Sequence, residues 1–305
     1  MLLTQSDGRQ TGRRTSRLAE LVALSRPSHA IKNLLLVPVA LIDVPHWTAG
    51  GLGSLAWPVL AFSLAGACVY VGNDIADRDR DRHHPVKRHR PIADGRVSVR
   101  AGILYCAALL ALLATVVVLA PGGPYWPVLA YLALNIAYTR GLKHVPLLDI
   151  GAVALGFVLR AAQGYVTLGA PVSAWLLVAV FSLCLLLLTG KRRHELITAG
   201  LAHRPALHGY SVELTDQLLP LCGVLSVVSG LTYLATDSPF GDYQQVAVLL
   251  SAPFALFVLF RYLQVLVVHR EGGDPVRMLL RDRAMAVTGV LWLGALAVLL
   301  AAVHR

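Results

Sequence analysis

Four side chains that carry oxygen ligands follow an apolar run, in the segment GNDIADRDRD at residues 72–81. They are Asn73, Asp74, Asp77 and Asp81. In a continuous helix such spacings place side chains on neighbouring parts of one surface, so we expect these four to cluster. Mg²⁺ takes oxygen ligands, typically one or two carboxylates together with substrate phosphates. The pattern therefore predicts a Mg²⁺–diphosphate site, and the alternative is a solvated loop of self-paired Asp and Arg residues.

Basic residues follow directly, in HPVKRHRP at residues 84–91. The proline near each end predicts a loop rather than a helix. Guanidinium and ammonium groups there could bind phosphates that a metal leaves exposed, although membrane topology alone would also favour cations at this place. The candidate substrate-binding residues in this and the other charged segments are Lys32, Asn73, Lys87, Arg88, Arg90, Tyr138, Lys143, Lys191, Arg192, Glu195 and Tyr210.

Arg160 is a different kind of candidate, because it lies well inside an apolar run. An arginine in lipid is expensive. We expect it to face the interior of a bundle, where it would pair with a carboxylate or bind a substrate phosphate. The alternative is that its side chain reaches the outer interface of the membrane.

The elements that must position these residues are membrane helices. Of the 305 residues 56% are hydrophobic and 14% are charged, against about 25% charged in soluble domains. A helix needs roughly 20 apolar residues to cross the hydrocarbon core. The sequence predicts an all-α, polytopic membrane protein, with a basic tail and interfacial helix at residues 1–25 and one transmembrane catalytic domain at 26–305. The expected spans are residues 27–46, 54–72, 101–120, 126–140, 146–165, 172–190, 217–236, 244–268 and 284–303.

Lys and Arg residues alternate from loop to loop along this pattern, which is what the positive-inside rule requires. The N-terminus is then cytoplasmic, and the charged loops lie on the cytoplasmic side of a bacterial plasma membrane. This topology accounts for the net charge of +10 without nucleic acid, and a basic face suits anionic lipid or a polyanionic substrate. The four cysteines lie in apolar spans without a CxxC pair, so neither zinc nor a disulfide is expected.

Six segments in order resemble the UbiA superfamily of intramembrane prenyltransferases, whose NDxxDxxxD motif matches residues 73–81. They most resemble the branch that transfers phosphoribosyl from phosphoribosyl pyrophosphate (PRPP) to decaprenyl phosphate. The resemblance implies a bundle of nine membrane helices with a cytoplasmic active-site cap and a dependence on Mg²⁺. The six segments are RPSHAIKN, NDIADRDRDRHHPVKRHRPIADG, LKHVPLLDIGAVALGFVLRA, GKRRHEL, GYSVEL and DPVRMLLRDR.

The sequence departs from the ordinary prenyltransferase pattern at one place. Those enzymes carry a second acidic motif, DxxxD, after the sixth span, whereas this sequence has Lys191 and Glu195 at that spacing. One acidic motif that faces a wall of cations fits one metal and many phosphates. It suits PRPP and a lipid monophosphate better than an aromatic acceptor.

The resemblance implies a reaction in which a phosphate oxygen of the polyprenyl phosphate attacks C1 of PRPP. Inversion would give a β-linked lipid phosphoribose and diphosphate. We expect Asp74, Asp77 and Asp81 to be catalytic and, with Asn73, to bind the metal. The first alternative is prenyl transfer from a prenyl diphosphate to an aromatic ring, and the second is a transporter or lipid-binding protein. The sequence leaves a homo-oligomer open.

Overall fold

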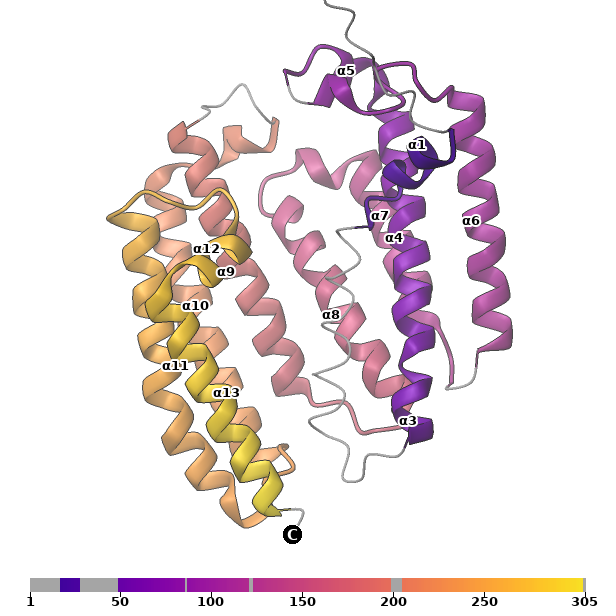
Figure 1. Ribbon diagram of the computed structural model, residues 1–305. Helices are drawn as coiled ribbons and strands as arrows, with labels where there is room; N and C mark the ends of the chain where they lie inside the picture. The colour runs from indigo at the N-terminus through magenta and orange to yellow at the C-terminus, as the bar shows by residue number, and fades with distance from the viewer. Residues whose placement is uncertain (1–16, 28–48, 86, 121–122, 199–204, 304–305) are drawn as a thin grey trace, which may run out of the picture.

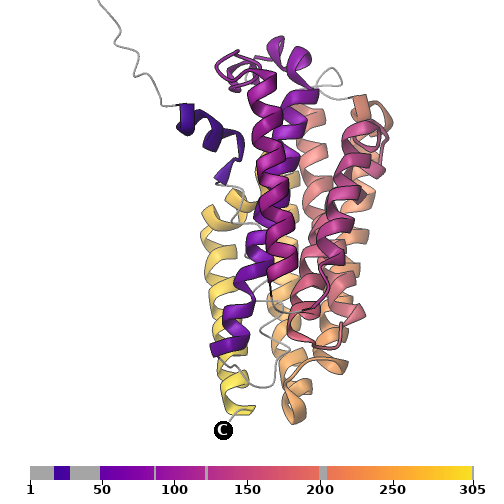
Figure 2. The same ribbon diagram turned by 90° about the vertical axis from the view of Figure 1, so that its right-hand side faces the viewer.

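The computed structural model describes residues 17–27, 49–85, 87–120, 123–198 and 205–303. Within these ranges every regular element is a helix (Figures 1 and 2), so the expected all-α class is confirmed. The first expected span, from residue 28 onward, and Lys32 lie outside the described residues.

Seven of the described helices are long and apolar enough to cross a membrane, and the chain is a multi-pass membrane protein. An eighth, α7 (Trp126–Arg140), has 15 residues. Each expected span from the second to the ninth falls on one of these eight helices. The seven long helices are α4 (Ala56–Ala76), α6 (Val99–Leu119), α8 (Leu148–Leu168), α9 (Ala174–Thr198), α10 (Val212–Thr236), α11 (Gln244–Val267) and α13 (Arg283–Val303).

Short helices connect or flank the long ones, and α1 falls where the interfacial helix is expected. One of them, α12, begins at a polar cap, where Asp274 accepts a hydrogen bond from the backbone nitrogen of Arg277. The short helices are α1 (Arg17–Leu24), α3 (Ala49–Ser54), α5 (Arg78–Arg82), η2 (Lys87–His89), η3 (Leu142–His144), η5 (Pro205–Gly209), η6 (Gly241–Tyr243) and α12 (Pro275–Arg281).

The helices pack in two groups that meet at α8 and α9. In Figure 1, α9 to α13 lie on one side and α4, α6 and α7 on the other. Phe62, Val128 and Tyr131 belong to the apolar core of the second group, and Leu219 and Tyr262 to that of the first. Many large apolar side chains on the outer faces stay exposed, as expected where lipid is the solvent.

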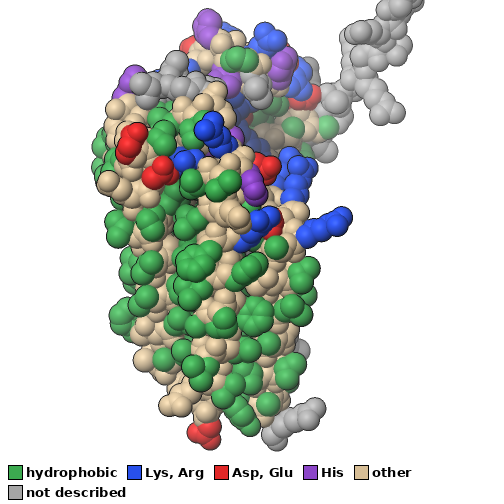
Figure 3. All heavy atoms as spheres, turned by 90° about the vertical axis from the view of Figure 1, so that its left-hand side faces the viewer, with side chains coloured by type: hydrophobic (Ala, Val, Ile, Leu, Met, Phe, Trp, Pro, Cys, Tyr) green, Lys and Arg blue, Asp and Glu red, His purple; other side chains and the backbone are tan. Residues whose placement is uncertain are grey.

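Charge gathers at one end of the bundle, as Figure 3 shows for one face. We call this the charged end: it comprises α5, η2, η3, η5 and α12 with the adjoining ends of the long helices. Apart from Arg160, every Lys and Arg among the described residues lies there or in the flanking segment of α1. Asp237 and Asp242 lie at the opposite end, near η6. This one-sided distribution is the pattern that the positive-inside rule describes.

Candidate active site at the charged end

The acidic motif does not lie on one continuous helix. α4 ends at Ala76, Asp77 has φ −94° and ψ 5°, and α5 begins at Arg78. Asp74 and Asp81, on either side of this break, are both buried at 2% exposure. Their oxygens accept hydrogen bonds from the same nitrogen, Nη1 of Arg90, at 3.0 and 2.6 Å. The break therefore brings two carboxylates onto a single positively charged atom.

A second cation completes the surroundings of Asp74. Nη2 of Arg26, just after α1, donates to its Oδ1 at 2.6 Å. The guanidinium of Arg26 also lies over the ring of Tyr70, with its carbon 5.0 Å from the ring centroid. A carboxylate this deeply buried requires such neutralisation, because an unpaired buried charge is costly.

Asn73 and Asp77 face a different part of the site. Oγ1 of Thr139, near the end of α7, donates to Oδ1 of Asn73 at 2.5 Å. Nζ of Lys143, in η3, donates to both oxygens of Asp77 at 2.9 and 3.2 Å. Asn73 and Asp77 therefore have partners that differ from those of Asp74 and Asp81, and the grouping of all four around one metal stays a prediction.

The pair Asp74 and Asp81 fits the requirements of Mg²⁺. Both supply hard oxygen ligands, and both already point at one cationic nitrogen. Two carboxylates together with substrate phosphates form a usual set for this ion. Among the described residues no three His, Cys, Asp or Glu side chains form a metal-binding group by themselves, so substrate phosphates would have to supply the other ligands.

A buried network occupies the position of the second acidic motif. Asp149, in the first turn of α8, is fully buried at 0% exposure. Nε of Arg192 donates to its Oδ2 at 2.8 Å, and the hydroxyl of Tyr210 donates to its Oδ1 at 2.6 Å. Nη1 of Arg192 also donates to Glu195 at 2.7 Å. Burial, followed by the hydrogen bond to Asp149, raises the pKa of Tyr210, so the phenol stays protonated at neutral pH.

This network changes what the predicted residues of GKRRHEL can do. Arg192 is 3% exposed and is paired with two carboxylates, so little of its guanidinium is open to a ligand. Glu195 already has a cationic partner in Arg192. Lys191 is half-buried and makes no ion pair within the part of the chain that the structure describes. Of the three, Lys191 is the one left to contact a phosphate.

The other candidates are spread over the charged end. Lys87 and Tyr138 are half-buried, and Arg88 is exposed, with its Nε 3.3 Å from Nε2 of His89. Sequence reasoning assigned no role to Arg26 or Thr139, although each contacts a residue of the acidic motif. The only available signal was their place, because Arg26 opens the segment RPSHAIKN and Thr139 lies in the loop-proximal turn of an expected span.

Comparison with known proteins identifies the family of the chain. A model of the UbiA prenyltransferase family matches residues 34–282. The chain belongs to this family. It is therefore a transferase. It is 32% identical over 289 residues to decaprenyl-phosphate phosphoribosyltransferase of Mycobacterium tuberculosis, which covers 90% of this chain and 92% of that protein. The protein of the same name from Corynebacterium glutamicum is 30% identical over 286 residues, covering 89% and 84%.

The fold is also that of a solved UbiA protein. A UbiA homologue from Archaeoglobus fulgidus, bound to DMAPP and Mg²⁺, superposes with a TM-score of 0.67. The match covers 93% of this chain and 99% of that one at 21% identity, so it bears on the fold alone.

Inside this UbiA bundle, Arg160 faces the interior as expected, and the alternative of an outward-reaching side chain is wrong. It is 8% exposed. Nη1 donates to the carbonyl of Gly156 at 2.7 Å and Nη2 to the hydroxyl of Tyr131 at 3.0 Å. The guanidinium carbon lies 4.5 Å from the ring centroid of Tyr131, with Phe157 and Phe62 also close. It lies about 16 Å along α8 from Asp149.

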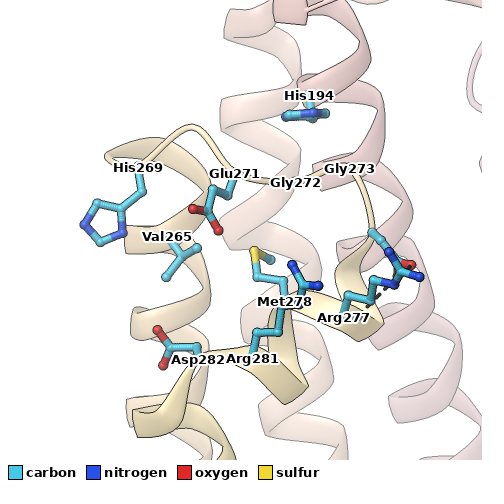
Figure 4. Close-up of a pocket in the computed structure, with 11 residues that line it drawn as sticks. His194, Val265, His269, Glu271, Gly272, Gly273, Arg277, Met278, Arg281 and Asp282 are labelled. Carbon is cyan, nitrogen blue, oxygen red and sulfur yellow. Dashed lines mark hydrogen bonds and ion pairs between the residues drawn. The ribbon is translucent and has the colours of Figure 1, made fainter.

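A separate hollow of about 420 Å³ lies among α9, α11 and α12 (Figure 4). His194 lines it from α9, whereas Arg192 on the same helix turns to Asp149 on α8. Within it Asp282 is held by Arg261 at 2.8 Å and Asp274 caps α12. None of the residues predicted from the sequence as site members lines this hollow, so it lies apart from the candidate active site.

Proposed function

We propose that the enzyme transfers the 5-phosphoribosyl group of PRPP to a polyprenyl phosphate, giving polyprenylphosphoryl-β-5-phosphoribose and diphosphate. One observation carries the proposal. The position of a second acidic motif holds Lys191 and a Glu195 that is neutralised by buried Arg192. The site therefore presents one acidic pair among many cations. The names of the relatives from Mycobacterium tuberculosis and Corynebacterium glutamicum point to the same reaction.

The cations around the acidic motif are suited to bind phosphate. Arg26 and Arg90 are about one quarter exposed, and Lys143 is 16% exposed. Each contacts a carboxylate through a hydrogen bond, which a phosphate oxygen can replace with equal geometry. PRPP offers a diphosphate and a 5-phosphate, and the acceptor offers one more phosphate. Together with Lys191, these residues supply four cations for the three groups.

Asp74 and Asp81 would hold Mg²⁺, with Asn73 and Asp77 beside them. When bound, the ion neutralises charge on the leaving diphosphate. The protein supplies orientation: cations fix the diphosphate on one face of C1, and the acceptor phosphate approaches the other face. A phosphate oxyanion is nucleophilic at neutral pH without a general base. Carboxylates such as Asp77 would stabilise the positive charge that develops on the ribosyl ring.

The membrane fixes where the two substrates meet. The polyprenyl chain of the acceptor belongs in the hydrocarbon region, while its phosphate belongs at the charged end. We place that end at the cytoplasmic face of a bacterial plasma membrane, because described Lys and Arg residues gather there. PRPP would then enter from the water side and the lipid from the bilayer.

Labelled PRPP and polyprenyl phosphate, incubated with the purified protein and Mg²⁺, test the proposal. The expected result is label in a lipid product whose mass equals polyprenyl phosphate plus phosphoribosyl, with release of diphosphate. The alternative within the family is prenyl transfer from a prenyl diphosphate to an aromatic acceptor. Consumption of a prenyl diphosphate while no label enters lipid would establish that alternative and exclude the proposed reaction.

A further inference from the structure

Asp149 joins three segments that are far apart in the sequence. Arg192 at the end of α9 and Tyr210 before α10 both donate to its side chain. The hydroxyl of Tyr210 in turn accepts a hydrogen bond from the backbone nitrogen of Leu147 at 2.8 Å. The start of α8, the end of α9 and the segment before α10 therefore meet at one fully buried carboxylate.

The segment that Tyr210 holds is conformationally demanding. Leu147 has φ +65°, a value that a leucine rarely adopts. Such a conformation persists only where surrounding contacts determine it. Next to it, Pro146 lies against Gly209, where an added Cβ would come within 2.2 Å of the proline ring. The contact with Tyr210 and this close approach fix the path of residues 145–149.

The same segment carries Lys143. The backbone nitrogen of Asp149 donates to the carbonyl of Val145 at 3.1 Å, and that of Val145 donates to Leu142 at 3.1 Å. η3 is thus tied through consecutive turns to the Asp149 side chain and its partners. Within η3, Lys143 bonds Asp77 of the acidic motif. A displacement at Asp149 would therefore reach Lys143 over a short, tightly turned stretch of chain.

We infer that Asp149 is a positioning residue for the transfer reaction, which acts through Tyr210 and Arg192 to hold Lys143 against the acidic motif. It has no exposed surface with which to touch a substrate. Its effect is on the place of a cation that contacts the donor diphosphate. The inference rests on the proposed function only in taking Lys143 as that contact.

Steady-state kinetics of Asp149→Asn and Tyr210→Phe test it, with the donor concentration varied. Misplacement of one phosphate-binding cation should raise KM for the donor about tenfold, with a smaller change in kcat. A purely structural defect lowers the amount of active enzyme, and so lowers apparent kcat while KM stays unchanged. Asp216→Asn is the matched control, because Asp216 pairs with the adjacent Arg193 at 2.5 Å and its side chain bonds no loop of the site within the described residues.

A double mutant identifies the route. In a Lys143→Gln background, Asp149→Asn should add less than a twofold change in KM, because the cation it positions is gone. The inference is overturned if the effects of Asp149→Asn and Lys143→Gln on KM multiply fully. It is also overturned if neither Asp149→Asn nor Tyr210→Phe changes KM. If Asp149→Asn does not fold, Tyr210→Phe decides the matter, since it keeps the ring and the Arg192–Asp149 pair.

The choice of donor separates this inference from the proposed function. The assay uses whichever diphosphate the wild type consumes, PRPP or a prenyl diphosphate. Failure to use PRPP would sink the proposed function, yet KM for the prenyl diphosphate would still decide the role of Asp149. If the wild type uses PRPP and Asp149→Asn has normal KM values, the proposed function stands and the positioning role of Asp149 is excluded.

Discussion

The end of α4 and the end of α9 are the two places where ordinary UbiA-type sequences carry acidic motifs, and here they differ in how their charges are held. At α4, the carboxylates bind cations that remain partly exposed. At α9, Glu195 binds Arg192, which is sealed between Glu195 and Asp149. A partly exposed cation can exchange one anionic partner for another, whereas breaking a fully buried pair leaves an uncompensated charge.

This difference separates two roles for similar residue types. The α4 end can give its cations to phosphates and its carboxylates to a metal, because both acquire new partners at the same time. Under the proposed function, the α9 end holds the loops in place and offers Lys191 for substrate binding. Charged residues would then serve chemistry at one end and architecture at the other, and the exposure of the cations is what distinguishes the two ends.

The largest loss of turnover is expected when a carboxylate is removed from the α4 end. We expect Asp77→Asn to lower turnover about a thousandfold, because the site loses negative charge where the donor reacts. The measurement is the initial rate with saturating substrates and Mg²⁺. Asp79→Asn is the matched control, since Asp79 is 79% exposed and pairs only with neighbouring Arg78 and Arg82 among the described residues. Equal losses in both variants would contradict a specific role for Asp77.

Installing a carboxylate at the α9 end should impair the use of PRPP. Lys191→Asp restores the spacing of the second acidic motif, and we expect kcat/KM for PRPP to fall about a hundredfold. The change removes a phosphate contact and adds repulsion close to Glu195. Lys191→Met separates the two causes, because it removes the cation without adding an anion, and should cost about tenfold. Retention of full PRPP activity in Lys191→Asp would contradict the assignment of this lysine.

Removing the cation shared by two carboxylates of the α4 end tests the metal site without any assay of turnover. Arg90 occupies the point on which Asp74 and Asp81 converge. We expect Arg90→Gln to bind Mn²⁺, measured by electron paramagnetic resonance in the absence of substrate, about tenfold more tightly than the wild type does. Arg88→Gln is the control, because Arg88 is exposed and forms no ion pair among the described residues. Unchanged affinity in Arg90→Gln would place the metal elsewhere.

The positions of the helices could be predicted from the sequence more completely than the site. Apolar length sets a span directly, and eight of the expected spans fall on described helices. The spacing of the acidic motif predicted one helical face, which assumed that the helix continues past Asp77. Whether a polar segment leaving a membrane stays helical depends on tertiary partners such as Arg90 and Lys143, which lie elsewhere in the sequence.

Burial was also hidden from sequence reasoning. Lys191, Arg192 and Arg193 are consecutive and look alike, yet they contact different parts of the molecule. Arg192 binds Asp149, Arg193 binds Asp216 and the carbonyl of Leu266, and Lys191 makes no ion pair in the described ranges. The helical rotation of 100° per residue separates them, but which direction is buried depends on how α8, α10 and α11 pack.

The smallest expected effect concerns an ion pair outside both motifs, which joins Asp282 to Arg261 of α11. Asp282 accepts hydrogen bonds from Arg261 at 2.8 and 3.1 Å and from the backbone nitrogen of Met285 at 2.9 Å. The hydrogen bond from Arg261 is the main cause that lowers the pKa of Asp282. A lowered folded-state pKa means that the stabilisation is present above the unfolded pKa and is lost as pH falls through the folded one.

We therefore expect Asp282→Asn to lower the midpoint of thermal unfolding by about 2 °C at pH 7, an effect that vanishes as pH falls below about 4. Turnover at a permissive temperature should not change, because Asp282 lies in the hollow among α9, α11 and α12, which no residue of the α4 motif lines. Asp274→Asn is the comparison variant, since its pair with Arg277 is long, at 3.7 Å, and exposed. A loss of PRPP turnover in Asp282→Asn would mean that the hollow among α9, α11 and α12 is coupled to the candidate active site. The distinction between exchangeable and architectural charges would then also apply to residues on that side of α9.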